Sequence, residues 1–89
     1  MPPLAKGSIS LRVYPADLPP PEVVADMRAQ ARLAEAAGFD GCMTSEHHGG
    51  FPNYLPNPLL AATWLLDATE HIWAGPCPLV LPLRAATQV

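Results

Sequence analysis

Polar and apolar residues alternate along residues 8–14, and the chain then changes to apolar positions at helical spacing. The alternation predicts a β-strand that ends at Pro15. A proline-rich linker, residues 17–21, follows, and proline is well tolerated in the first turn of a helix. The sequence next predicts a helix that continues through Ala37, in which five residues recur at helical spacing: Val23, Met27, Gln30, Ala31 and Ala34.

A glycine marks the end of this helix, and a short apolar segment follows it. Gly38 is expected to adopt the left-handed conformation that ends many helices, with Phe39 folding back onto the last turn. Residues 42–44 are short and apolar enough to form a buried strand. Residues 49–57 combine glycine, proline and asparagine, and this mixture predicts a loop.

A second helix and a third apolar run complete the pattern. Asn57 followed by Pro58 predicts a helix start, because asparagine can cap the first turn and proline has no amide hydrogen to leave unpaired. Residues 59–69 are almost wholly apolar, which predicts a helix buried on several sides. Residues 72–81 have strand character but contain two prolines. The order strand, helix, strand, helix, strand with long crossovers predicts an α/β fold with parallel strands.

The composition narrows the class of protein. The chain has 89 residues, of which 49% are hydrophobic, so it can form at most one small domain. Charged residues make up 15% of the chain, against ~25% in soluble domains, which favours surfaces covered by something else. A net charge of -3 with five Lys and Arg residues argues against nucleic acid as a partner. The sequence shows neither a bilayer-spanning run nor the apolar core of a secretory signal, so we expect no membrane association and a cytoplasmic location.

Glu46, His47 and His48 stand where the second predicted strand ends, and strand ends are where α/β proteins place their chemistry. Three interpretations are open. A metal site is disfavoured and we predict none, because adjacent strand residues point to opposite faces and no Cys-x-x-Cys motif accompanies the histidines. A histidine can instead bond a loop carbonyl as a structural group. The third interpretation is a neutral imidazole that acts as a base or hydrogen-bond donor in a pocket.

Two prolines flank Cys77 in the third apolar run. Proline cannot donate to the ladder of a central strand, so an edge or a bulge is expected here, and either bond to proline can be cis. A bulge could bring bare backbone against a flat ligand, whereas a frayed strand is the alternative. Cys42 and Cys77 lie in apolar stretches, which favours buried reduced thiols over a disulfide. Phe51 and Tyr54 in the preceding loop can wall a pocket or anchor the loop on the surface.

Several of these motifs share an order and a spacing with a known family. They are Gly38-Phe39-Asp40, Ser45-Glu46-His47-His48, Asn57-Pro58 and Leu81-Pro82-Leu83-Arg84. In this set the chain resembles the N-terminal part of the bacterial-luciferase-like flavin monooxygenases. The match extends from Gly38 to about Leu83, and the first predicted strand and helix follow the same plan. After Arg84 the family commonly continues with His-Pro, where this chain has two alanines.

The resemblance implies a fold, a cofactor and a site. Members of the family are (β/α)8 barrels that bind reduced flavin mononucleotide (FMN), or in some branches the deazaflavin F420, at the C-terminal mouth. By this resemblance His47 is the catalytic residue, serving as a base or hydrogen-bond partner while oxygen adds to the flavin. Glu46 matches a residue that lines the flavin pocket. Cys77 and Pro78 match a strand bulge with an unusual cis peptide, against which the isoalloxazine ring rests.

Length limits what the chain is expected to do alone. A complete TIM barrel needs ~250 residues, so residues 1–89 are expected to be an incomplete N-terminal portion of the barrel, inactive by itself. The leading hypothesis is a flavin-dependent monooxygenase that uses reduced FMN and O₂ on a small organic substrate, with His47 projecting into a cavity near Cys77 and Pro78. Two alternatives remain: a non-catalytic α/β fragment stabilised by self-association through its open strand edges, and an F420-dependent oxidoreductase that transfers hydride.

Overall fold

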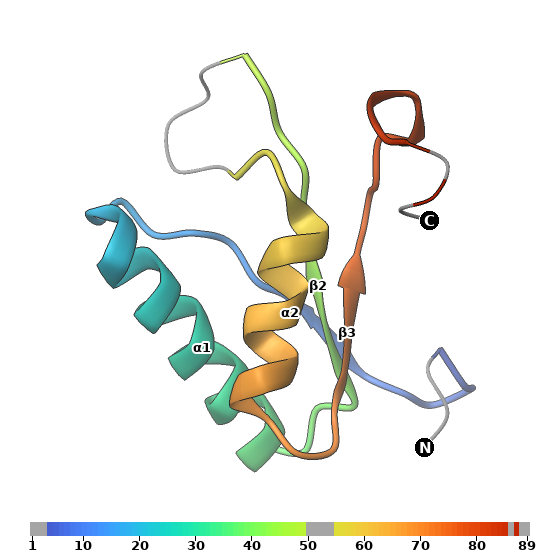
Figure 1. Ribbon diagram of the computed structural model, residues 1–89. Helices are drawn as coiled ribbons and strands as arrows, with labels where there is room; N and C mark the ends of the chain where they lie inside the picture. The colour runs from blue at the N-terminus through green and yellow to red at the C-terminus, as the bar shows by residue number, and fades with distance from the viewer. Residues whose placement is uncertain (1–3, 50–54, 86, 88–89) are drawn as a thin grey trace.

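The computed structural model describes residues 4–49, 55–85 and 87, and these residues form an α/β arrangement (Figure 1). The elements in chain order are β1 (Ser10–Arg12), α1 (Pro20–Ala36), β2 (Gly41–Thr44), α2 (Pro58–Ala68) and β3 (Trp73–Pro76). A short 3-10 helix, η1 (Leu81–Leu83), follows β3. The predicted α/β class and the predicted order of elements are confirmed. In the described ranges no helix is both long and apolar enough to cross a lipid bilayer.

The strands form one parallel sheet in the order β1, β2, β3. Its register pairs Leu11 with Cys42 and Cys42 with Ala74, and all of these side chains lie in or against the hydrophobic core. Helix α1 packs on β2 and on α2, and α2 packs on β2 and β3, so both helices cover the same face of the sheet (Figure 1). Because the strands are parallel, their C-terminal ends share one edge. Among the described residues, the second face of the sheet carries no α-helix.

The third strand is shorter than the sequence predicts. Strand β3 ends at Pro76, and the last backbone bond of the ladder runs from the Cys77 N–H to the Thr44 oxygen at 2.6 Å. Pro78 has no amide hydrogen to continue the ladder, so the chain leaves the sheet and turns into η1. The predicted extension of this strand to residue 81 is therefore wrong. Strand β1 is likewise limited to Ser10–Arg12 within the predicted residues 8–14.

Helix α1 has the start, the buried face and the end that its sequence predicts. Pro20 and Pro21 occupy its first turn, where amide hydrogens have no partner within the helix. Its buried side chains are Val23, Met27, Ala31 and Ala34. Gly38 has a φ of 93°, and the Phe39 N–H donates to the Ala34 oxygen at 3.0 Å. Phe39 packs against the core, which directs the chain from α1 into β2.

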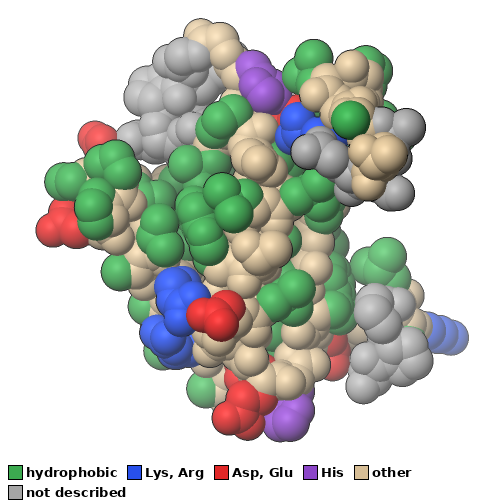
Figure 2. Space-filling view, in the orientation of Figure 1, with side chains coloured by type: hydrophobic (Ala, Val, Ile, Leu, Met, Phe, Trp, Pro, Cys, Tyr) green, Lys and Arg blue, Asp and Glu red, His purple; other side chains and the backbone are tan. Residues whose placement is uncertain are grey.

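Helix α2 begins as predicted but is less buried than predicted. The Asn57 side chain accepts a hydrogen bond from the Leu60 N–H at 3.2 Å and so caps the helix. Leu65 is completely buried, but Leu60 and Leu66 are 49% and 47% exposed. Apolar side chains gather over the helix-covered side of the molecule (Figure 2). The helix thus buries one face here, and the expectation that it is buried on several sides is wrong for the described residues.

Candidate active site

The segments that follow β2 and β3 lie next to each other at the C-terminal edge of the sheet. The hydrogen bond from the Cys77 N–H to the Thr44 oxygen joins the two strand ends directly. Thr44 is itself fixed, because its buried hydroxyl donates to the Pro58 oxygen at the start of α2 at 2.7 Å. Glu46 and His47 follow Thr44 within three residues. The structure therefore brings the predicted site residues of β2 and β3 to one edge, as expected for a parallel sheet.

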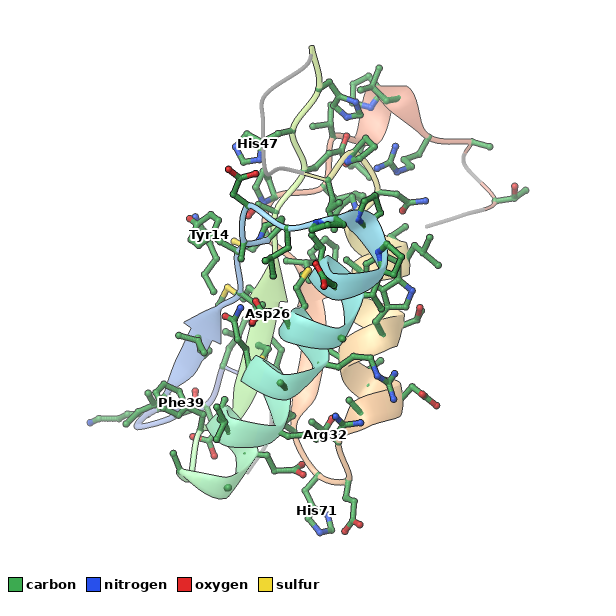
Figure 3. The ribbon with its side chains drawn as sticks, turned by 90° about the vertical axis from the view of Figure 1, so that its left-hand side faces the viewer. Tyr14, Asp26, Arg32, Phe39, His47 and His71 are labelled. Atoms are coloured by element: carbon green, nitrogen blue, oxygen red, sulfur yellow. The ribbon has the colours of Figure 1, made fainter. Side chains whose placement is uncertain are left out.

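His47 is half-buried just beyond β2, and its backbone N–H donates to the Leu55 oxygen at 3.2 Å. Figure 3 shows the side chains of His47 and Tyr14 at the same end of the sheet and His71 at the opposite end. The His71 side chain is 83% exposed. His47 and His71 therefore occupy different environments, and of these two it is His47 that lies with the strand ends.

The carboxylate of Glu46 is fully buried, with a side-chain exposure of 0%. Its Oε1 accepts hydrogen bonds from the Val80 N–H at 3.1 Å and from Arg84 Nη2 at 2.5 Å. Its Oε2 lies 2.6 Å from His48 Nε2, and because an ionised carboxylate only accepts, Nε2 carries the hydrogen. Burial by itself raises the pKa of Glu46, but the bonds from His48 and Val80 and the charge of Arg84 outweigh it and leave this pKa below its ordinary value of 4.5.

The Cys77-Pro78 peptide bond is cis. Cys77 is half-buried, and its Sγ accepts a hydrogen bond from Arg12 Nη2 at 3.3 Å. Arg12 Nη1 also donates to the Tyr14 hydroxyl at 3.4 Å. These bonds place a guanidinium group from β1 beside the thiol, on the side of the sheet that the helices leave open.

Both cysteines are free, so the expectation of reduced thiols is confirmed. Cys42 is completely buried against the helices, and burial raises the pKa of its thiol. Cys77 is only half-buried. The prediction that both thiols are buried is therefore wrong for Cys77, because this side chain lies with Arg12 and away from the core.

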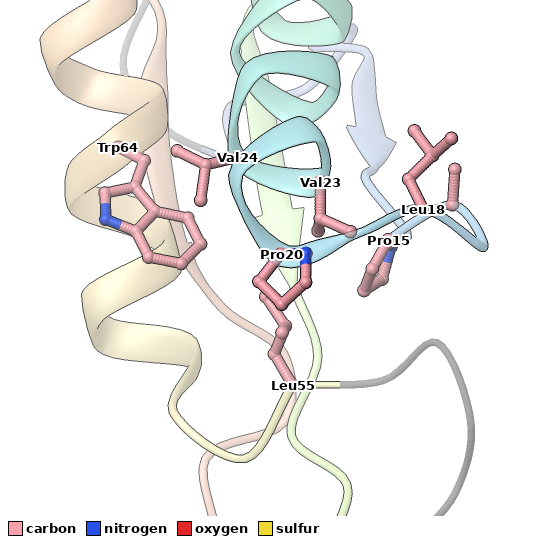
Figure 4. Close-up of a pocket in the computed structure, with 8 residues that line it drawn as sticks. Pro15, Leu18, Pro20, Val23, Val24, Leu55 and Trp64 are labelled. Carbon is pink, nitrogen blue, oxygen red and sulfur yellow. The ribbon is translucent and has the colours of Figure 1, made fainter.

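An apolar cavity of about 240 Å³ lies apart from these residues (Figure 4). It is formed by the segment before α1, the first turns of α1, and two side chains from the α2 region, Leu55 and Trp64. Glu46, His47, Cys77 and Pro78 do not line it. The cavity expected beside His47 therefore stays a prediction, and Phe51 and Tyr54, the other predicted pocket residues, lie outside the described residues.

Three polar residues at this edge had no predicted role: Arg12, His48 and Arg84. A signal for Arg12 existed, since the alternation of residues 8–14 puts Arg12 and Tyr14 on one face of a strand. Arg84 contacts Glu46 across 38 positions of the sequence, and no local pattern reveals such a contact. Within the described ranges, no three His, Cys, Asp or Glu side chains come close enough together to hold a metal ion.

Comparison with known proteins agrees with this arrangement. The family model of luciferase-like monooxygenases matches residues 7–89. Similar curated proteins are the alkanal monooxygenase alpha chains of Photorhabdus laumondii subsp. laumondii, Photorhabdus luminescens and the Kryptophanaron alfredi symbiont. Each is 34% identical over 76 residues, which cover 85% of this chain and 21% of the relative. The chain thus spans about a fifth of the length of these relatives, and it belongs to the luciferase-like monooxygenase family.

Proposed function

We propose that residues 1–89 supply the first three strands and two helices of a (β/α)8 barrel that oxidises a small organic substrate with reduced FMN and O₂. One observation carries the proposal: His47 and the Cys77-Pro78 pair follow neighbouring parallel strands, whose ends are joined by the bond from Cys77 to Thr44. Barrels of this class bind their ligands at the C-terminal strand ends. The relatives are named alkanal monooxygenases, which agrees with monooxygenation as the reaction class.

The flavin is assigned to the helix-free side of the strand ends, where Cys77 and Pro78 would support its ring and Glu46 would belong to its pocket. Space on this side supports the assignment, because a Cβ built on Gly75, two residues before Cys77, meets no atom within 4 Å. Reduced flavin, when bound, supplies the electrons that activate oxygen. Because glycine has no side chain, a flat ring can approach the backbone closely at Gly75.

His47 is assigned the role of base or hydrogen-bond partner at the reacting centre. Imidazole can take up or release a proton near neutral pH. Its backbone bond to Leu55 at 3.2 Å holds residue 47 at the strand end, which is the position that such a group requires. The assignment concerns proton handling by the imidazole, and not attachment of the cofactor.

The test is His47→Ala in a complete barrel that carries these 89 residues. We expect turnover to fall by ~10²–10⁴-fold, the usual contribution of a positioned acid–base group, with a much smaller loss of flavin affinity. His71→Ala is the matched control, because that exposed histidine lies at the opposite end of the sheet (Figure 3). Equal turnover in the His47 variant and its parent would remove His47 from the mechanism.

Titration with reduced FMN and with F420 identifies the cofactor, and omission of O₂ separates monooxygenation from hydride transfer to an acceptor. A barrel that turns over only with F420 and without O₂ would replace the monooxygenase by the oxidoreductase alternative. The isolated 89 residues are expected to bind either cofactor weakly or not at all, because they span 21% of the relatives' length. Tight stoichiometric binding by this chain would contradict that expectation.

The second candidate function is that of a non-catalytic α/β fragment that is stabilised by self-association. Exposed apolar side chains favour this alternative. Leu33 is 70% exposed on α1, while Leu60 and Leu66 on α2 are 49% and 47% exposed. Strands β1 and β3 also form the two edges of the sheet, and unpaired edges can recruit another strand. Size-exclusion chromatography with light scattering decides the matter, since a compact and stable monomer would refute association.

A further inference from the structure

The buried carboxylate of Glu46 connects three separate segments of the chain. Its partners Val80 and Arg84 come from the segment after β3, and His48 comes from the segment after β2. Arg84 Nη2 also donates to the Pro56 oxygen at 3.3 Å, in the segment before α2. We call Glu46, His48 and Arg84, with the Val80 N–H, the carboxylate clamp.

The charged groups of the carboxylate clamp are buried, so they need partners to be stable. The Glu46 side chain is 0% exposed and that of Arg84 is 11% exposed. An ionised carboxylate removed from water is tolerated only when it is paired and hydrogen-bonded. Both oxygens of Glu46 meet this requirement, since Oε1 has two donors and Oε2 has one. These bonds therefore form only in one relative placement of the segments after β2 and β3. A shift of the segment after β3 breaks the charge-assisted bonds from Val80 and Arg84 to Glu46.

The clamp holds the two parts of the proposed site together. Glu46 is adjacent to His47, and Val80 is two residues from Pro78, a distance of at most ~7 Å along the chain. Fixing Val80 against Glu46 thus limits how far Pro78 can move relative to residue 47. Both Glu46 carboxylate oxygens are at the same time hydrogen-bonded, and the side chain is 0% exposed, so a flavin could contact them only after a group that covers the carboxylate had moved.

We propose that Glu46 and Arg84 are positioning residues, which set the Cys77-Pro78 segment against His47 through the carboxylate clamp, and that the Glu46 side chain does not bind the flavin directly. The catalytic consequence rests on the proposed function, whereas the clamp itself does not. In this arrangement Glu46 belongs to the pocket by holding its wall in place. His48 orients the second carboxylate oxygen from the exposed side, where its own side chain is 41% exposed.

The first experiment measures the clamp without any flavin. Amide hydrogen exchange of Val80 is followed by NMR in the 89-residue chain, and Glu46→Gln is expected to accelerate it at least about tenfold because the charge-assisted acceptor is lost. Glu70→Gln is the control for removal of one negative charge, since that side chain is 84% exposed. Unchanged exchange of Val80 in Glu46→Gln, with the Cys77 amide still protected, overturns the clamp.

A milder variant covers the case in which Glu46→Gln does not fold. Arg84→Lys keeps the positive charge but loses the planar group that reaches both Glu46 and Pro56. We expect it to retain the fold and to accelerate Val80 exchange less than Arg84→Gln does. Equal exchange in the parent, Arg84→Lys and Arg84→Gln chains would overturn the proposal.

The second experiment separates positioning from direct flavin contact in a complete barrel. Dissociation constants for reduced FMN are measured for Glu46→Gln, Arg84→Gln and the double variant. A clamp predicts that both single variants weaken binding by similar factors, that the double variant is no worse than either, and that Arg84→Lys restores part of the loss. If Glu46 touches the flavin, its variant alone has the large effect and the two factors multiply. A barrel that binds no flavin at all defeats the proposed function, while the exchange experiment still decides the clamp.

Discussion

Replacing Gly41 with alanine forces a methyl group into the indole ring of Trp73. A Cβ built on Gly41 lies 2.0 Å from Cε2 and 2.2 Å from Cδ2 of that ring, whereas carbon atoms in contact are ~3.5–4.0 Å apart. The overlap arises because the register of β2 and β3 pairs Gly41 with Trp73. The same register pairs Thr44 with Pro76 and places Cys77 beside Thr44. The substitution therefore tests the strand alignment on which the candidate site depends.

Two opposing contributions set the size of the effect. Crowding of a packed site costs about 1–3 kcal/mol when neighbouring groups must move. Alanine also restricts the unfolded chain more than glycine does, which stabilises by about 0.4–1 kcal/mol at a compatible position. The net expectation for Gly41→Ala is a loss of about 1–2 kcal/mol. In a Trp73→Ala background the ring is absent, so the same substitution is expected to stabilise by about 0.4–1 kcal/mol.

The assay is urea unfolding of the parent, the two single variants and the double variant, followed by far-UV circular dichroism. The coupling energy between Gly41→Ala and Trp73→Ala is expected to be about 1–3 kcal/mol, above the ~0.3–0.5 kcal/mol scatter of independent sites. Gly75→Ala is the matched control in the same sheet, because its new Cβ meets no atom within 4 Å. If Gly41→Ala is no more destabilising than Gly75→Ala, or if the coupling is below about 0.5 kcal/mol, the assigned register is refuted.

Two further measurements test burial and charge. A thiol reagent is expected to modify half-buried Cys77 before fully buried Cys42 in the native chain, and equal native rates by mass spectrometry would contradict these exposures. Backbone hydrogen bonds, of which that from the His71 N–H has the largest effect, lower the pKa of Glu35 below its ordinary value of 4.5. The ionised Glu35 carboxylate therefore stabilises the fold above pH 4.5, and this stabilisation is lost as the pH falls through the pKa of the folded state. Glu35→Gln is therefore expected to destabilise the chain near neutral pH and to have little effect in strong acid; a pH-independent loss in urea unfolding would disprove this role of Glu35.

Local signals in the sequence were sufficient to predict the order of elements and several of their ends. Asn57 and Gly38 show why, because a cap and a left-handed stop act within four residues of their own position. The end of β3 also has a local cause, although the predicted end is wrong. The apolar character of residues 72–81 predicts a strand over the whole run, but Pro78 has no amide hydrogen, and hydrogen bonding determines where a strand stops.

Contacts between distant residues could not be predicted in this way. The carboxylate of Glu35, near the end of α1, accepts bonds from the N–H groups of Glu70, His71 and Ile72 at 2.7–3.2 Å and so fixes the turn before β3. Arg84 reaches Glu46 only because the fold brings the two strand ends together. Neither contact leaves a periodic trace in the sequence, since each depends on the tertiary arrangement and not on spacing along one element.

The Glu46-His47-His48 tripeptide combines a buried, hydrogen-bonded carboxylate with the histidine to which catalysis is assigned. The side chains of Glu46 and His48, two positions apart just after β2, lie close together. A bond of 2.6 Å joins His48 Nε2 to Glu46 Oε2. Glu46 also contacts Arg84, where its charge is buried and paired. The buried carboxylate therefore belongs to the tertiary contacts with the segment after β3, and the role proposed for His47 rests on its place directly beyond β2.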